Sequence, residues 1–522
     1  MLTEKLYCDN LRRLELLKIV RGTEAIKIAI YRNHSFEMIS NVLNAFLSET
    51  NLQASFLYSD YDDSLNFQFK EADLQLIWID TNRYKLRNLV SFLKERAGVL
   101  RLQTKSPILI AYTGDTKLEI DNLTTDCFAL YVPEYINVFG DGAYDLLKEP
   151  FSGTRLSSKS CLEIARVLGM KYLPALLQTP LKAIVVDLDN TLYKGVLGED
   201  GVDNLVPNFE LQQQLKELKN KGFFLCIASK NEEDDAKKMF NQRADFILKW
   251  EDFTTYQINW NSKAENIIKI SQALNIGFDS ILFIDDNPAE IQNVERLGIK
   301  TILAKDNISQ IIKYYPGLLK LKTSDEDAVR SRDIQANEQR LQMLKSLTTE
   351  EYFKKLGIRL EYGINIEEQL PRVAELLNKT NQFILSYVRY NETQVKEFIS
   401  NPNSLLITIK MSDNLSDSGI IAICLVTKEN NNLFVNELTV SCRALGRNLE
   451  HIMLPYMFKI AYESLGCTGF VNIAYKKGER NAPALKWLCE YSNSDLKEKG
   501  NISLPCKDVS LEGLEVEVII NG

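Results

Sequence analysis

The chain has 522 residues but is poor in histidine and in paired cysteine. Only two histidines occur, His34 and His451, so a serine triad or a histidine-rich metal centre could draw on no others. The nine cysteines are scattered, with no Cys-x-x-Cys pair. This spacing favours reduced thiols and disfavours a zinc site.

The chain also lacks a long apolar run and an excess of positive charge. No uninterrupted apolar stretch approaches the roughly 18 residues of a membrane span, and the start, MLTEKLYCDNLRR, has no apolar signal-peptide core. The formal net charge of −8 gives no reason to expect nucleic acid. We therefore expect a cytoplasmic protein with neither a membrane nor a nucleic-acid partner.

Length and patterning predict a multidomain α/β protein. The predicted regions are an open α/β layer over residues 1–178, a motif-bearing core over 179–322, a charged helical linker over 323–348 and a mixed domain over 349–522.

The most informative stretch reads IVVDLDNTLYKGVLGEDG, residues 184–201. The apolar run 183–186 is typical of a buried parallel strand, and two acids, Asp187 and Asp189, follow it. Burial of neighbouring carboxylates is unfavourable unless a cation lies beside them. Mg²⁺ held by carboxylate oxygens, at the carboxyl end of a parallel sheet, is the expected cation.

Further polar groups follow in a fixed order, two of them directly after the apolar strands 223–228 and 281–284. The side chains concerned are Ser229, Lys230, Lys263, Asp285 and Asp286. Lys263 begins a helical pattern, and the others follow strand ends, so all of them can converge in one crevice. The gaps between these motifs are too short for an inserted lid domain. We expect an open site covered only by a short flap around residues 192–206.

These motifs resemble the four motifs of the haloacid dehalogenase (HAD) superfamily. The resemblance implies a capless, Rossmann-like core in which Asp187 is a phosphoryl-accepting nucleophile and Asp189 is the general acid and base. It implies phosphate contacts from Thr191, Ser229, Lys230 and Lys263. It also implies a Mg²⁺ site formed by Asp187, Asp285 or Asp286, and the backbone carbonyl of Asp189.

Further runs extend the resemblance over nearly the whole chain: DLDNTLYKGVLGEDG, SKNEEDD, FIDDNPAE, NKTNQF and SCRALGR. They are similar to the FkbH-like family of bifunctional glyceryl transferase/phosphatases. The resemblance implies 1,3-bisphosphoglycerate as substrate, an acyl carrier protein as partner, and a product used in polyketide or related biosynthesis. Tyr193 and Lys194 depart from the Trp-Gly pair that is common in that family.

Two other functions stay open. One is a plain Mg²⁺-dependent phosphatase whose remaining domains dock a partner. The other is a coenzyme A-dependent acyltransferase whose phosphatase core is regulatory. The enzyme can be incubated with a carrier protein, 1,3-bisphosphoglycerate and Mg²⁺. The mass of the carrier protein afterwards would distinguish these two functions from the glyceryl transferase/phosphatase.

The region 349–522 resembles an N-acetyltransferase-like α+β fold. A predicted strand, 434–440, leads through SCRALGR into a helical pattern over 449–462. A turn that opens a helix can bind pyrophosphate or a pantetheine arm through backbone N–H groups. The residues expected to bind the arm are Arg443, Gly446, Arg447 and Asn481.

Two cysteines are candidates to carry a glyceryl group as a thioester. Cys442 lies beside Arg443 and just before a predicted helix, whose dipole should lower the thiol pKa. Cys226 is the alternative, but it is expected to be buried in mid-strand. A small buried core residue is the competing interpretation for Cys442.

The region 1–178 resembles an SGNH-hydrolase-like layer, with strands expected at 26–31, 74–79 and 108–112. Ser35 stands where such a hydrolase carries its nucleophile. No histidine occurs between residues 35 and 450, so the triad would lack its base. We expect a degenerate scaffold or docking module.

Overall fold

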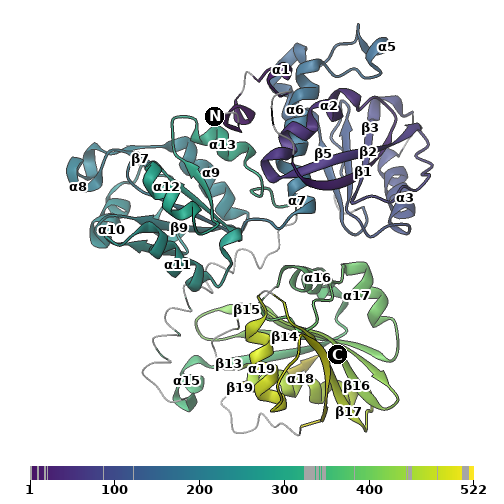
Figure 1. Ribbon diagram of the computed structural model, residues 1–522, viewed down its shortest axis with the longest axis vertical. Coiled ribbons are helices and arrows are strands. Elements are labelled where there is room, and N and C mark those ends of the chain that lie inside the picture. Colours follow the sequence, from purple (N-terminus) through teal and green to yellow (C-terminus); the bar gives the residue numbers. More distant parts are fainter. Residues whose placement is uncertain are drawn as a thin grey trace. The chain divides into compact units, whose positions relative to one another are not determined.

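The computed structural model describes residues 3–521, apart from 9–10, 17–18, 20–21, 86–87, 121–122, 322–335, 337–339, 341–342, 344–348, 381, 442–443, 445–448, 479 and 508–515. The chain separates into two compact units, Met1–Leu218 with Ser229–Trp250 and Phe278–Thr323, and Lys219–Ala228 with Glu251–Gly277 and Ser324–Gly522. Three larger β-sheets lie within residues 24–131, 183–303 and 358–521 (Figure 1). Each sheet falls inside one of the ranges expected for a domain, and the boundaries themselves stay a prediction.

The first sheet is parallel, with the strand order β2-β1-β3-β4-β5. Its strands are β1 (Glu24–Arg32), β2 (Leu52–Tyr61), β3 (Leu74–Asp80), β4 (Ile108–Thr113) and β5 (Cys127–Tyr131). The main helices of this region are α2 (Glu37–Leu47), α3 (Leu89–Arg101), α6 (Ser158–Val167) and α7 (Leu173–Leu177), with short α1 (Arg13–Leu16), α4 (Pro133–Ile136) and α5 (Glu149–Ser152). This is a doubly wound order, and the three strands expected from the sequence are confirmed. The finer SGNH-like assignment stays a prediction.

The second sheet has the order β10-β9-β6-β11-β12. Its strands are β6 (Ala183–Val186), β9 (Phe224–Ser229), β10 (Thr255–Ile258), β11 (Ile281–Asp285) and β12 (Lys300–Leu303). The helices between and after them are α9 (Phe209–Asn220), α10 (Glu233–Gln242), α11 (Lys263–Leu274), α12 (Pro288–Glu295) and α13 (Ile308–Tyr314). Numbered along the chain, this is the 3-2-1-4-5 order of a Rossmann-like sheet. The order in which strands are added reverses between β6 and β11, and this change of direction is the topological switch point of the sheet. Ligands of such sheets bind outside the carboxyl ends at that change of direction.

The flap expected over this edge is a small two-stranded structure. Strand β7 (Tyr193–Lys194) pairs with β8 (Val206–Pro207), and the short helix α8 (Leu197–Asp200) lies between them in sequence. Residues 187–285 are all described, and apart from this flap they contain only the strands and helices of the second sheet. The expectation of a core without a lid domain is therefore confirmed.

The third sheet is mixed, with the order β18-β17-β16-β15-β14-β13-β19. Its strands are β13 (Ile358–Ile364), β14 (Ser404–Ser412), β15 (Asp417–Glu429), β16 (Asn432–Val440), β17 (Phe470–Lys476), β18 (Lys499–Pro505) and β19 (Val516–Asn521). Its helices are α15 (Thr349–Leu356), α16 (Leu370–Lys379), α17 (Glu392–Ile399), α18 (Glu450–Ser464) and α19 (Ala482–Ser492) (Figure 1).

Side chains alternate between the two faces of this sheet. In β14, Leu405, Ile407 and Ile409 pack with residues of α18 and α19, whereas Leu406 packs with residues of α16 and α17. Both faces are therefore covered by helices. No described helix of the protein is long and apolar enough to cross a membrane.

A separate segment fills a gap between β16 and β17. These strands pair in parallel only from Leu433 to Val435. Beyond that point Leu385 bridges them, because its N–H donates to Leu438 and its carbonyl accepts from Lys476. The carboxylate of Glu437 holds the same segment.

Glu437 has no exposed surface. Its Oε1 accepts the N–H groups of Leu385, Ser386 and Leu438 at 2.9–3.0 Å, and its Oε2 accepts that of Val388 at 2.7 Å. Burial raises its pKa to about 7, although the four hydrogen bonds lower it. This glutamate therefore acts as a fixed part of the fold.

The predicted helical linker, residues 323–348, lies almost wholly outside the described residues. Ala336, Arg340 and Met343 are described, and each is helical. The buried guanidinium of Arg340 forms a bidentate pair with the buried Asp413, with both N–O distances at 2.8 Å. This contact anchors one linker residue to the loop that joins β14 and β15.

Candidate active site

Asp187 comes directly after β6, where four apolar residues form a fully buried strand. Its N–H donates to the carbonyl of Ile284 in β11, at 3.0 Å. The chain then turns sharply at Asn190, which has a φ of 52°. The Asn190 side chain accepts the N–H of Gly195 at 3.1 Å, which stabilises the turn. The strand end thus places Asp187 at the change of direction in the sheet.

Asp187, Asp285 and Asp286 form a carboxylate cluster. One oxygen from each lies within 4.8 Å of the others. Asp187 is 4% exposed and Asp285 is 0% exposed. Their convergence at the carboxyl ends of β6 and β11 is what the strand-end motifs predicted. Among the described residues, these three aspartates are the acidic, histidine or cysteine side chains that lie close enough together to hold a metal ion.

The chemistry of this cluster fits Mg²⁺. Three carboxylates within such a distance, two of them buried and that of Asp286 half-buried, repel one another, and a divalent cation removes that repulsion. All the donors are oxygens, the ligands that Mg²⁺ prefers. The Asp189 carboxylate is not part of the cluster, and its backbone carbonyl as a ligand stays a prediction.

Asp189 is held by hydrogen bonds from three elements. Its Oδ1 accepts from the Tyr193 hydroxyl at 2.7 Å and from the Leu197 N–H at 3.0 Å. Its Oδ2 accepts from the Asn231 amide at 2.9 Å. Two of these donors belong to the flap and the third follows β9, so the flap and the strand end meet at this carboxylate.

Ser229 ends β9 and is buried. Its hydroxyl accepts a hydrogen bond from Asn231, at 3.2 Å, so one amide touches both Ser229 and Asp189. Cys226, in the same strand, is fully buried, and burial raises the pKa of its thiol to about 12. This confirms that Cys226 is a core residue and makes it a poor nucleophile.

The other expected phosphate ligands differ in their surroundings. The ammonium of Lys230 pairs with Glu290 of α12 at 2.6 Å. Thr191 is buried, and its hydroxyl has no hydrogen-bond partner within the described structure. Lys263 is the buried first residue of α11, as the helical pattern predicted. Phosphate binding by these residues stays a prediction.

The residues expected to serve acyl transfer are only partly described. Cys442, Arg443, Gly446 and Arg447 lie outside the described residues. Asn481 is fully buried, and its amide donates to the carbonyls of Ile384 and Lys476 while its oxygen accepts from Gly478. All its hydrogen bonds go to backbone, so this geometry gives Asn481 a structural role and does not support contact with a pantetheine arm.

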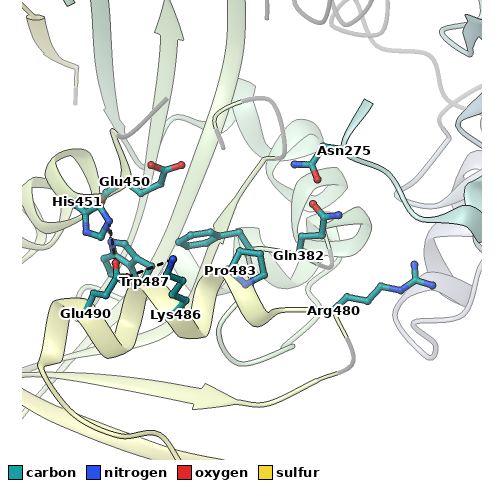
Figure 2. A pocket seen from close by; sticks show the side chains of 10 residues that line it. Asn275, Gln382, Glu450, His451, Arg480, Pro483, Lys486, Trp487 and Glu490 are labelled. Carbon is teal, nitrogen blue, oxygen red and sulfur yellow. Dashed lines mark hydrogen bonds and ion pairs between the residues drawn. The ribbon is translucent and has the colours of Figure 1, made fainter. Parts of the chain in front are cut away.

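A cavity of about 410 Å³ lies between the first turns of α18 and α19. Phe383 and Trp487 contribute apolar surface to its lining, their ring centroids 5.9 Å apart. Arg480 also lines it (Figure 2). His451 and Glu490 both line it and contact one another, with Nε2 and Oε2 3.3 Å apart (Figure 2). His451 follows the SCRALGR run closely in sequence, so the cavity adjoins that run along the chain.

The turn after β1 contains no catalytic triad. The Ser35 hydroxyl donates to Glu37 at 2.7 Å, and His34 contacts Thr154 through Nδ1 at 3.0 Å. Burial, followed by nearby arginines, lowers the pKa of His34 to about 3. A neutral imidazole that does not touch the serine supports the interpretation of a degenerate site.

Three further residues contact the expected site side chains and are absent from the set expected from the sequence: Tyr193, Asn231 and Glu290. Asn231 stands two positions after Ser229, on the same side of an extended chain, and that spacing was an available signal. Tyr193 was noted only as a departure from a family pattern. Glu290 ends the FIDDNPAE run, but its pairing with Lys230, 60 positions away, could not be inferred along the chain.

No protein-family model and no curated protein matches the chain. Among solved structures it is similar to the N-terminal part of protein BF1531 from Bacteroides fragilis, which contains a phosphatase domain complexed with Mg, at 20% identity over 62% of this chain and 99% of that one, with a TM-score of 0.46. It is also similar to the HAD family enzyme bt-2542 from Bacteroides thetaiotaomicron, in complex with magnesium and inorganic phosphate (16% identity, 24% and 94% covered, TM-score 0.19). A third is an IAA acetyltransferase from Bacillus cereus (12% identity, 25% and 74% covered, TM-score 0.19). All three TM-scores are below 0.5, so these similarities carry no argument about function.

Proposed function

We propose that this protein is a Mg²⁺-dependent phosphatase of the HAD type. The observation that carries the proposal is the cluster of Asp187, Asp285 and Asp286 at the change of direction of a Rossmann-like sheet, with Asp189 two residues from Asp187. Mg²⁺ bound there would screen the charge of a phosphoryl group. Buried acids, a nearby proton donor and an open edge together suit phosphoryl transfer to a carboxylate.

The chain's own groups account for both halves of such a reaction. A carboxylate oxygen of Asp187 attacks phosphorus, the ester P–O bond breaks, and Asp189 gives a proton to the leaving oxygen. Asp189 then takes a proton from water as that water attacks the aspartyl phosphate. Inorganic phosphate leaves and Asp187 is regenerated. Ser229 and Thr191 would hold phosphoryl oxygens throughout.

The test is release of inorganic phosphate from a phosphate monoester in the presence of Mg²⁺. Asp187→Asn is expected to abolish release with the fold retained, because an amide cannot form the aspartyl phosphate. Asp306→Asn is the matched control: this fully exposed acid is 3.9 Å from the exposed Lys194. Near wild-type release by Asp187→Asn would show that the assignment is wrong.

We further propose that phosphate release is coupled to glyceryl transfer from 1,3-bisphosphoglycerate to an acyl carrier protein. A thiolate attacks the acyl-phosphate carbonyl, a C–S bond forms, the acyl C–O bond breaks and the C1 phosphate leaves as inorganic phosphate. The phosphate monoester at C3 is hydrolysed at Asp187, which leaves a glyceryl thioester. The carrier thiol then takes the acyl group by exchange. Support comes from the five FkbH-like sequence runs and from the cavity that adjoins SCRALGR along the chain.

Intact-mass spectrometry of enzyme and carrier tests this coupling. Wild type should gain a glyceryl adduct on Cys442 and load the carrier, whereas Cys442→Ser should do neither. Cys506→Ser, which changes a half-buried thiol at the end of β18, is the control. Phosphate release with an unchanged carrier mass indicates a plain phosphatase. Carrier loading that requires acyl-coenzyme A indicates an acyltransferase.

A further inference from the structure

The two oxygens of the Asp189 carboxylate accept different numbers of hydrogen bonds. Oδ1 accepts two hydrogen bonds, from the Tyr193 hydroxyl and the Leu197 N–H, whereas Oδ2 accepts one, from Asn231. A carboxylate oxygen offers two lone-pair sites. Oδ1 is therefore the more occupied oxygen, and Oδ2 offers the more open position for a proton or a substrate oxygen.

We propose that Tyr193 and Asn231 are positioning residues that present Oδ2 of Asp189 to the leaving oxygen of the substrate. The inference rests on the proposed phosphatase, in which Asp189 transfers the proton. Tyr193 and the Leu197 N–H fix the carboxylate through Oδ1, and Asn231 sets the direction in which the last lone pair of Oδ2 points.

Tyr193 is suited to this role by its burial. Its side chain is 0% exposed, and its ring lies 5.8 Å from that of Phe246. Burial, and then the charge of Asp189, raise the pKa of its hydroxyl far above the ordinary value, so the hydroxyl remains a donor. Because Tyr193 and Leu197 both belong to the flap, the flap and the Asp189 carboxylate are fixed together.

Asn231 links the proton donor to the expected phosphate contact. It is 6% exposed, and its amide nitrogen reaches Asp189 Oδ2 at 2.9 Å and Ser229 Oγ at 3.2 Å. Both hydrogens of the amide are used, so the side chain cannot rotate without losing one bond. The Asn231 amide thereby fixes Oδ2 of Asp189 relative to the Ser229 hydroxyl, which would bind a phosphoryl oxygen.

Leaving-group dependence distinguishes this role from a general structural one. Protonation matters when the leaving oxygen is strongly basic, as in an alkyl phosphate, and matters little for 2,4-dinitrophenyl phosphate. Tyr193→Phe keeps the ring and removes one hydrogen bond to a charged group. We expect kcat/KM to fall about 10- to 100-fold on the alkyl phosphate and less than about 3-fold on the dinitrophenyl ester.

Two further variants complete the test. Asn231→Ala should show the same dependence on the leaving group, so the inference does not depend on Tyr193→Phe alone. Tyr362→Phe is the matched control, because Tyr362 is also fully buried and donates to a backbone carbonyl, that of Met453, at 3.2 Å. Tyr362→Phe should leave kcat/KM unchanged on both substrates.

The outcomes separate the two levels of inference. Equal losses on both substrates, or no loss on either, in Tyr193→Phe and Asn231→Ala would overturn the positioning role. A wild-type protein that releases no phosphate with Mg²⁺, or an active Asp187→Asn variant, would instead overturn the phosphatase and the positioning role with it.

Discussion

The protein buries carboxylates in two different ways. In the second sheet, Asp187, Asp285 and Asp286 place oxygens within 4.8 Å of one another at the strand ends. In the third sheet, a single carboxylate, that of Glu437, accepts four backbone N–H groups. Neutral donors make a single buried acid part of the fold, whereas several acids together require a cation. The distinction separates a candidate metal site from a structural residue of equal burial.

Removal of one charge should affect the two places in opposite ways. Asp285→Asn is expected to lower phosphate release by at least about 100-fold, because it weakens the metal site. In metal-free protein it should lower the midpoint of thermal unfolding less than Glu437→Gln does, since the loss of like-charge repulsion offsets any weakening of the hydrogen bond that Asp285 accepts from the Asn287 N–H at 2.8 Å. Glu437→Gln should keep activity within about 2-fold but destabilise by about 1–3 kcal/mol, because an amide NH₂ would face an N–H donor.

Phosphate release and calorimetric unfolding of both variants check this contrast. The Asp306→Asn variant controls for the loss of an acid at the surface. A well-folded Glu437→Gln protein that releases no phosphate would show that Glu437 is needed for activity. The distinction between a functional cluster and a structural glutamate would then be wrong.

Metal binding should sharpen the comparison. A ligand that binds only the folded state at 100 times its Kd stabilises by about 2.7 kcal/mol. We expect Mg²⁺ to raise the thermal midpoint of the wild type and of Glu437→Gln by a matching amount, and to have little effect on Asp285→Asn. Ca²⁺ should also bind but should not support turnover, since its looser coordination misplaces the nucleophile. Equal Mg²⁺ shifts in all three proteins would place the metal elsewhere.

The smallest expected effect is the pH dependence due to Glu437. Burial raises its pKa from 4.5 to about 7. Between these values the folded state binds a proton that the unfolded state has lost, so the free energy of unfolding falls as pH rises. Relative to Glu437→Gln, the free energy of unfolding of the wild type should fall by about 1 kcal/mol for each unit by which the pH rises between about pH 5 and pH 7. Unfolding at several pH values measures this, and a parallel pH profile of the variant would contradict it.

Much of the site could be predicted from local patterns. A run such as residues 183–186 specifies a buried strand through its apolar, β-branched side chains, and parallel strands bring their carboxyl ends to one edge. Asp187, Ser229 and Asp285 were located in this way. The buried position of Cys226 in mid-strand followed from the same reasoning. Asn481 was assigned to ligand binding from its motif, and its fully bonded amide shows why a motif alone is not sufficient.

Local sequence patterns were enough to predict which residues follow the strands of the core, where the helices α11 and α18 begin to within a residue, and that the core has no lid. The partners of those residues depend on the three-dimensional fold. Asn231 contacts Asp189 across 42 positions, and Glu437 contacts Ser386 across 51. Strand and helix patterns are short-range and can be read along the chain, whereas a hydrogen bond between distant loops depends on how the whole sheet brings them together.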